Sequence, residues 1–349
     1  MKRITLSSMV LLLIVSGILA GCSQPAPSGG APSSGDKVAD AFKGKTMTIH
    51  VSASPGGGAD TFARLTANHL PERLGLEAVM VVNEDQASGM VARNQVFKNT
   101  PADGLHLLAD PIGAQWPAWA LDVTGVDYDV TKFKYIAAVK GAGQVLIVDP
   151  NGPYSTVEGL RNAKEEIRFS STTAGSLNAL APLATIEILG LNGKVITGYK
   201  GSAERILAIK RGEVIGAFVP LETALERKNE FKMLFLVSAE RSSDYLDIPC
   251  LGDVIELTDY HKSLLSAIVD DGRLIAAPPN TPDETVKYLR DKVTEIFNDA
   301  KFQEDVKKAG TPWIGFWTGE ELAARATKLA QDKKVYLDVY KELSAKLIK

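Results

Sequence analysis

The sequence predicts an α/β protein made of two successive units and a helical C-terminal portion. Strand-like and helix-like patterns alternate between residues 46 and 109, and the alternation restarts at residue 145 and continues to residue 237. A repeated strand–helix–strand pattern implies parallel strands joined by right-handed crossovers. The chain has 349 residues, which is long enough for two domains of ordinary size.

In the first unit, apolar and polar residues alternate and predict a strand over 46–53. Apolar residues at helical spacing predict a helix over 60–74, which Pro71 should kink or restart. The same patterns predict a strand over 79–82, a helix over 88–98 and a strand over 105–109.

The second unit repeats this alternation with more elements. Ser155 and Ser202 are expected to cap two of its helices, because serine at the N-cap accepts a free helix N–H. The predicted strands cover 145–148, 167–171, 195–197, 215–219 and 233–237, and the predicted helices cover 155–163, 176–189 and 202–210.

Two capping boxes mark the C-terminal helices. The stretch 281–284 (TPDE) has proline at the first helical position and predicts a helix through Phe297. The stretch 318–321 (TGEE) is the second box and predicts a long terminal helix.

The N-terminal residues are expected to lie outside the fold. Two basic residues precede an apolar run over 9–20, which is short for a membrane span and typical of a secretory signal. The run leads into LAGC ending at Cys22, which resembles the bacterial lipoprotein box. We expect residues 1–22 to be a lipoprotein signal peptide with Cys22 lipidated; an ordinary secretory signal is the alternative. The Pro/Ser/Gly-rich start of residues 23–44 predicts a flexible tether.

Composition excludes several classes. Hydrophobic residues make up 45% and charged residues 23%, which is typical of a globular protein. The net charge of −3 leaves no basic surplus for nucleic acid. Beyond Cys22 the sole cysteine is Cys250, in an apolar stretch, so a buried small side chain is expected rather than a disulfide.

Four small-residue loops follow predicted strands, where open parallel sheets bind ligands. The first contains Ser54 and three consecutive glycines; Gly57 and Gly58 leave backbone N–H groups uncovered, and Asp60 is expected as the helix N-cap. The other three loops contribute Ser88 and Gly89 from 85–89, Gly175 and Ser176 from 172–176, and Lys200 from 199–202.

These loops do not match known catalytic motifs. No Gly-Lys-Ser/Thr follows the three glycines, and Ser176 lacks the second glycine of a nucleophile elbow. The four histidines show no metal-ligand spacing, so we expect no metal, no cofactor and no enzyme activity, with a hydrolase as a remote alternative. Taken singly, such a loop is usually a plain turn, but four of them in two successive α/β units are more specific.

Trp116 and Trp119 follow the predicted strand over 105–109. Trp116 in particular is expected to line a ligand cleft and to stack on an aromatic or long-chain ligand. Hydrophobic packing at the junction between the two units is the alternative.

The order of these landmarks resembles one family. The motif PGGGAD (55–60) is followed by PADG (101–104), YKG (199–201), GEV (212–214) and APPNTP (277–282). Together they resemble the extracytoplasmic receptors of tripartite tricarboxylate transporters, the TctC or Bug family. The resemblance implies a two-lobed, periplasmic-binding-protein-like (Venus flytrap) fold of class II. Lobe 1 would comprise 45–144 and 272–349, and lobe 2 would comprise 145–271.

The resemblance also implies a function. Ser54, Gly57, Gly58, Asp60, Ser88 and Gly89 would face Gly175, Ser176 and Lys200 across a cleft that holds a small organic carboxylate. We expect an exported, lipid-anchored monomer that closes on this ligand and delivers it to membrane permease subunits. Presentation of the ligand to a membrane sensor is the alternative. The ligand is a di- or tricarboxylate, an aromatic carboxylate or an amino acid, and departures from the family pattern in 83–89 and at Asn178 bear on which.

Overall fold

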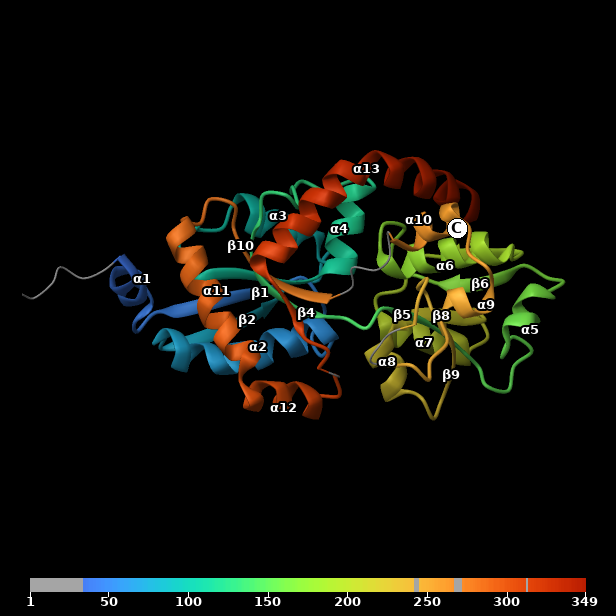
Figure 1. Cartoon of the computed structure of the whole chain (residues 1–349), viewed down its shortest axis with the longest axis horizontal. Coiled ribbons are helices and arrows are strands. Elements are labelled where there is room, and N and C mark those ends of the chain that lie inside the picture. The colour runs from blue at the N-terminus through green and yellow to red at the C-terminus, as the bar shows by residue number, and fades with distance from the viewer. Residues whose placement is uncertain (1–33, 242–244, 267–271, 312) are drawn as a thin grey trace, which may run out of the picture.

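The computed structural model describes residues 34–241, 245–266, 272–311 and 313–349. Its strands form two separate sheets, each covered by helices, and the two halves lie end to end in an elongated molecule (Figure 1). We call the half around the six-stranded sheet lobe 1 and the half around the five-stranded sheet lobe 2. Cys22, the predicted signal peptide and the beginning of the predicted tether lie outside the described residues.

The sheet of lobe 1 combines a parallel core with antiparallel strands. Its strands are β1 (Thr46–Val51), β2 (Ala78–Asn83), β3 (His106–Pro111), β4 (Lys134–Lys140), β10 (Gly272–Ala277) and β11 (Phe316–Thr318). They lie in the order β11-β4-β10-β3-β1-β2. The predicted parallel pairing of the first three strands is confirmed, because β1 is parallel to both β2 and β3. Strand β10, from much later in the chain, is antiparallel to β3 and β4.

The sheet of lobe 2 repeats this plan. Its strands are β5 (Gln144–Val148), β6 (Ile167–Ser170), β7 (Gly193–Ile196), β8 (Gly216–Pro220) and β9 (Lys232–Leu236), in the order β7-β6-β8-β5-β9. Strand β6 is parallel to β7 and β8, whereas β5 is antiparallel to β8 and β9. All five strands were predicted within three residues of their observed bounds.

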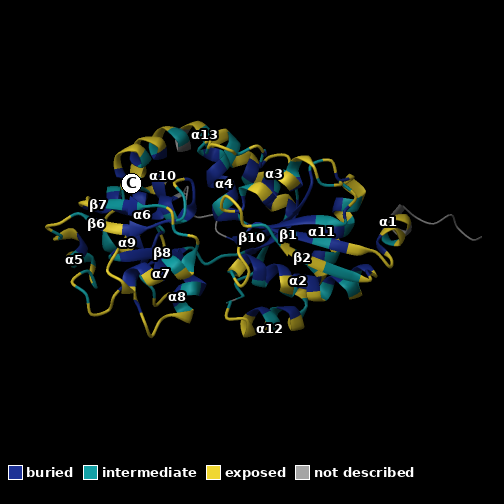
Figure 2. Ribbon diagram, turned by 180° about the vertical axis from the view of Figure 1, so that it is seen from behind, coloured by how far each residue is buried: buried dark blue, intermediate teal, exposed yellow. Residues whose placement is uncertain are grey.

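Helices cover both faces of each sheet. Those that begin in lobe 1 are α1 (Ser34–Phe42), α2 (Gly58–Leu74), α3 (Met90–Lys98), α4 (Ile112–Ala120), α11 (Asp283–Asn298), α12 (Ala300–Lys308) and α13 (Gly319–Leu347). Lobe 2 has α5 (Val157–Arg161), α6 (Leu177–Leu189), α7 (Ser202–Lys210), α8 (Leu221–Glu226), α9 (Leu251–Val254) and α10 (Asp259–Ser266). The strands are mostly buried between these helices, whose outer faces are exposed (Figure 2).

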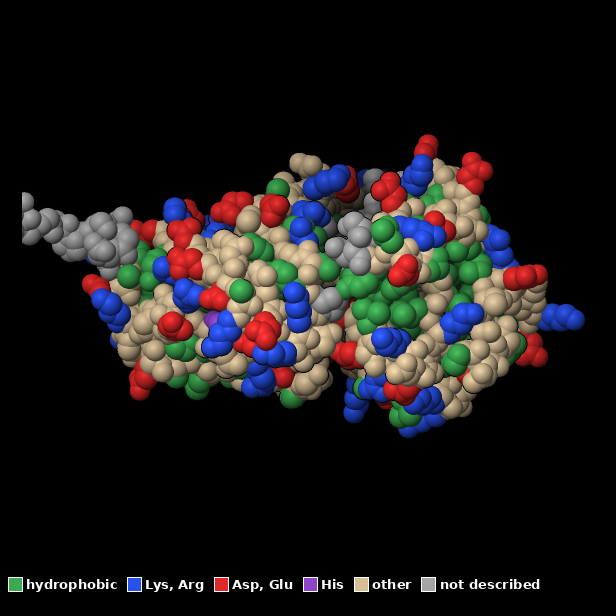
Figure 3. Space-filling model, turned by 60° about the horizontal axis from the view of Figure 1, so that its bottom comes forward, with side chains coloured by type: hydrophobic (Ala, Val, Ile, Leu, Met, Phe, Trp, Pro, Cys, Tyr) green, Lys and Arg blue, Asp and Glu red, His purple; other side chains and the backbone are tan. Residues whose placement is uncertain are grey.

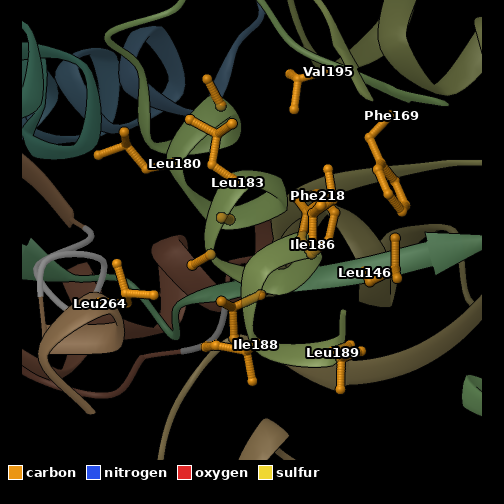
Figure 4. Packing of buried hydrophobic residues seen from close by; sticks show 14 of the residues in the cluster. Leu146, Phe169, Leu180, Leu183, Ile186, Ile188, Leu189, Val195, Phe218 and Leu264 are labelled. Carbon is orange, nitrogen blue, oxygen red and sulfur yellow. The ribbon is translucent and has the colours of Figure 1, made fainter. Parts of the chain in front are cut away.

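Helix α6 forms the centre of lobe 2. It is apolar on nearly all sides, as expected for a helix surrounded by protein. Leu180 and Leu183 of α6 lie in one core cluster with Phe169 and Phe218 of the sheet, whose ring centroids are 5.3 Å apart (Figure 4). Cys250 is buried, as predicted, and has no disulfide partner within the described part of the chain.

The structure corrects two local predictions and confirms a third. Helix α2 continues through Pro71 without restarting and ends at Gly75, which is left-handed with φ 69°; the burial of Leu70 and Leu74 offsets the missing N–H of proline. The predicted box at 281–284 is absent, because the N-cap is Pro282 and the buried Thr281 hydroxyl has no partner among the described residues. The box at 318–321 is confirmed.

Both ends of the described chain depart from the expected division. Residues 34–42 form α1 instead of tether, because Val38 and Phe42 are buried against lobe 1. Helix α13 has 29 residues and is therefore about 43 Å long. It starts on lobe 1 and ends on lobe 2, where Tyr340 joins the core and Ile348 pairs with Val195 (Figure 1). The segment 272–349 is therefore divided: most of it belongs to lobe 1, and the end of α13 belongs to lobe 2.

Candidate functional site

The lobes meet at the edges of the sheets where the parallel strands end. The chain crosses from β4, which ends at Lys140, to β5, which begins at Gln144. Space-filling shows two masses that meet along a narrow notch (Figure 3). At this junction a Cβ on Gly175 of lobe 2 would lie 2.3 Å from Val123 of lobe 1, and a Cβ on Gly113 of lobe 1 would lie 2.8 Å from Leu177 of lobe 2. The lobes are therefore in close contact.

The triple-glycine loop joins β1 to α2 at this edge. The N-cap of α2 is Gly57 rather than Asp60, and the helix begins at Gly58. Among the described residues, no acceptor binds the N–H groups of Gly58 and Ala59, which are unpaired because they open a helix. Free N–H groups at a helix start favour an anion.

Asp60 shapes this loop from behind. Its carboxylate accepts the N–H of Gly56 at 2.8 Å and the amide of Asn83 at 2.9 Å, and Arg64 lies 2.9 Å away. Burial opposes ionisation, but hydrogen bonds from Arg64, Gly56 and Asn83 outweigh it and hold the pKa of Asp60 below its ordinary value. All of these partners belong to the protein, so Asp60 positions the loop and is not retained as a ligand contact.

Arg273 supplies a positive charge at the same loop. It lies on β10, and a Cβ on Gly58 would lie 2.7 Å from its Nη2 and 2.8 Å from its Nε. Only a glycine leaves room for the guanidinium in this position. Arg273 Nη1 also lies 3.4 Å from Glu222 Oε1 of α8, and these side chains are 12% and 3% exposed. The ion pair therefore connects the glycine loop of lobe 1 with lobe 2.

The loop over 85–89 is held against the end of β1. Gly89 has φ 80°, and a Cβ there would lie 1.9 Å from the carbonyl oxygen of Ser52. Arg93 donates to the carbonyl of Ser88 at 3.0 Å and forms a buried ion pair with Asp110 at 2.8 Å. Burial opposes the charge of Arg93, but Asp110 outweighs burial and raises the pKa of Arg93. This buried pair fixes the position of Ser88 and Gly89.

On lobe 2, the predicted loop over 172–176 contains a cluster of hydroxyl groups. Ser176 is the N-cap of α6, is 4% exposed, and donates its hydroxyl to the carbonyl of Thr173 at 2.7 Å. The side-chain oxygen of Asn178 accepts from the Ser171 hydroxyl and the Thr172 N–H, both at 2.8 Å. Gly175 is needed for close packing against lobe 1, as described above.

Trp116 lies away from the junction, whereas Lys200 and Ser54 are exposed. Trp116 is 3% exposed in the core of lobe 1, and its indole N–H donates to Tyr135 at 3.1 Å. It does not line the junction, because α4, which the sequence did not predict, turns it inward. Lys200 is exposed, and its side chain forms no hydrogen bond or ion pair with the described residues. Ser54 is exposed and donates to Asp85 at 2.5 Å.

A cavity of about 570 Å³ lies at the opposite edge of the lobe 1 sheet, where β4 begins. Lys134 and Arg290 line it, but Lys134 pairs with Asp283 at 2.7 Å and Arg290 pairs with Glu320 at 2.7 Å. Both cations are thus neutralised. None of the four predicted ligand loops contributes to this cavity.

Sequence reasoning missed Arg273, Glu222 and the buried Arg205 of lobe 2. Arg273 interrupts the otherwise apolar strand β10, and Glu222 lies two residues after the end of the apolar strand β8. A charged residue within or just after a buried strand is a usable signal, since such charges need a partner. What the sequence lacks is the identity of that partner.

The described residues contain neither a membrane-spanning helix nor a metal-binding cluster. None of their helices combines the length and apolarity that crossing a membrane requires. They also contain no group of three or more His, Cys, Asp or Glu side chains placed to hold a metal ion.

Comparison with known proteins agrees with this architecture. A UPF0065 protein of Bordetella pertussis is 26% identical over 282 residues, covering 79% of this chain and 84% of its own. MatC of Rhodopseudomonas palustris with bound malate has a TM-score of 0.68 at 19% identity, covering 85% of this chain and 99% of its own. Rpa4515 of the same organism with adipate has a TM-score of 0.68 at 20% identity, covering 86% and 96%.

These structural likenesses establish the fold, and the predicted two-lobed periplasmic-binding-protein class is confirmed. The family model described as "Tripartite tricarboxylate transporter family receptor" matches residues 62–334, which is most of the chain. The chain therefore belongs to the receptor family of the tripartite tricarboxylate transporters.

Proposed function

We propose that this protein captures a small organic carboxylate between its lobes and delivers it to the membrane subunits of a tripartite transporter. One observation carries the proposal: the unpaired N–H groups of Gly58 and Ala59 and the guanidinium of Arg273 converge at the lobe junction. A carboxylate accepts hydrogen bonds from backbone N–H groups and from arginine with high strength. The related folds named above hold malate and adipate, which are both carboxylates.

Capture would proceed by opening and closing of the lobes. Because the lobes touch in the described structure, entry requires them to separate. A ligand that binds both lobes favours the closed form and shifts the population toward it. The chain crosses between the lobes from β4 to β5 and again along α13, and these crossings limit the motion to a hinge.

The experiment is a thermal-shift screen of the protein against carboxylates, each paired with its uncharged amide. A ligand that binds the folded state increases the free energy of unfolding by about 2.7 kcal/mol at a hundredfold excess over Kd, and the melting temperature rises accordingly. We expect at least one carboxylate to raise it and the paired amide to leave it unchanged. If no carboxylate did so, or if amides acted equally well, the proposal would be wrong.

We further propose that Cys22 carries lipid and keeps the protein, as a monomer, at the outer face of a membrane. The support is the sequence LAGC ending at Cys22 after a short apolar run. Growth with labelled palmitate should label the full chain and not its Cys22→Ser variant. Equal labelling of both would exclude this anchor.

A further inference from the structure

Lobe 2 contains a buried guanidinium that has no carboxylate partner among the described residues. Arg205 lies in the first turn of α7 and is 2% exposed. Its Nη1 donates to the carbonyl of Phe218 at 2.6 Å and its Nη2 to the hydroxyl of Ser202 at 3.2 Å. Its Nε has no hydrogen-bond partner among the described residues. Burial alone lowers the pKa of Arg205 to about 10, since no carboxylate offsets the lost hydration.

A second unpartnered donor lies on the same face of the sheet. The Ser170 hydroxyl is fully buried and has no partner among the described residues. Ser170 pairs with Ala217 of β8, and Ala217 packs with Ile206 of α7, so the Ser170 side chain faces α7. Phe218, whose carbonyl binds Arg205, is the next residue after Ala217. The register therefore brings Ser170 close to Arg205 at the end of β6.

This end of β6 is the edge of lobe 2 that faces lobe 1. Strand β5 enters from lobe 1 at Gln144, opposite Pro220, the last residue of β8. Two residues later Glu222 meets Arg273 of lobe 1. A buried cation without a counter-ion is costly, so its presence at a ligand-facing edge calls for an anion from outside the chain.

We propose that Arg205 and Ser170, with Ser202, form an anion subsite in lobe 2 for a carboxylate of the captured ligand. The inference rests on the proposed function, in which the glycine loop and Arg273 of lobe 1 hold another carboxylate. The ligand is then a dicarboxylate with one acid group bound by each lobe. Its second carboxylate supplies the missing counter-ion of Arg205 when the lobes close, which favours the closed form.

The test is calorimetry with dicarboxylates from succinate to suberate, each paired with the monocarboxylate of the same length. Arg205→Met removes the charge and keeps a long stem. For the tightest dicarboxylate we expect a roughly tenfold to hundredfold loss of affinity, and no change for its paired monocarboxylate. Ser170→Ala should weaken the same dicarboxylate by roughly threefold to tenfold. Arg211→Met, an exposed cation at the other end of α7, is the matched control and should change neither.

Stability separates ligand recognition from a structural role. Because Arg205→Met removes an uncompensated buried charge, the ligand-free variant should melt at a higher temperature than the wild type. If Arg205 only held the Phe218 carbonyl, Arg205→Met would lower the melting temperature and weaken dicarboxylate and monocarboxylate binding equally. That result would overturn the subsite. Unchanged dicarboxylate affinity in Arg205→Met would also overturn it. If that variant fails to fold, Ser170→Ala decides, because unchanged dicarboxylate affinity there refutes the subsite.

The two proposals fail differently. A wild type that binds monocarboxylates as tightly as dicarboxylates keeps the capture function and refutes the subsite alone. A wild type that binds no carboxylate of either kind refutes the capture function, and the subsite with it.

Discussion

A methyl group on Gly58 tests the link between the glycine loop and the lobe junction. In Gly58→Ala the new Cβ would lie 2.7 Å from Arg273 Nη2 and 2.8 Å from Nε. Carbon contacts at their optimum are about 3.5–4.0 Å long, so the guanidinium must move by roughly 1 Å. Arg273 Nη1 is already 3.4 Å from Glu222 Oε1, and a further displacement breaks the contact.

The expected loss follows from what this contact does. Glu222 is 3% exposed, and its Oε2 has no partner among the described residues, so losing Arg273 leaves a buried carboxylate unpaired. A hydrogen bond to a charged group contributes about 1.5–3 kcal/mol. We therefore expect Gly58→Ala to weaken carboxylate binding roughly tenfold to a hundredfold in calorimetry, with the fold retained.

Gly57→Ala is the matched control. It adds the same methyl group one residue earlier, at an ordinary φ of −77°, and meets only the Ser54 carbonyl at 3.2 Å. A double-mutant cycle with Glu222→Gln completes the test, because Gly58→Ala should cost little once the ion pair is gone. Equal affinities of the Gly57 and Gly58 variants, or additive effects in the cycle, would refute this reasoning.

Three further predictions concern stability. Asp60→Asn should lower the free energy of unfolding at neutral pH. Because the pKa of Asp60 in the folded state lies below the ordinary 3.8, the difference from wild type should persist above that pH and vanish as acid protonates the folded state. A constant difference in denaturation curves from pH 7 to low pH would contradict this. Gly89→Ala should cost several kcal/mol, roughly 3 or more, in urea denaturation, because its Cβ meets the Ser52 carbonyl at 1.9 Å and its φ is 80°; a stability like that of wild type would mean that the loop can shift. Trp116→Phe should lower stability by about 1 kcal/mol through loss of the hydrogen bond to Tyr135 and leave ligand affinity unchanged, and a changed affinity would return Trp116 to the site.

Local pattern was sufficient for much of this molecule. Alternation and helical spacing within short windows predicted β1, β2 and β3 of lobe 1 and the five strands of lobe 2, because side-chain periodicity depends only on neighbouring residues. The other strands of the lobe 1 sheet, β4, β10 and β11, were not predicted. Small residues after strands predicted the loops at the lobe junction, since the ends of parallel strands meet at one edge. Helix α4 was missed because Trp116 and Pro117 conceal its helical pattern.

Tertiary structure decided which groups face one another. Arg273 and Gly58 are 215 positions apart and meet because β10 returns to lobe 1 after the whole of lobe 2 has been formed. Arg205 shows a similar dependence, since only the register of β6 and β8 brings it near Ser170, and no carboxylate of the described residues offsets its charge. The sequence alone thus determined most of the elements and the edge where we propose that a ligand binds. The charges at that edge depended on long-range strand order, which no local pattern encodes.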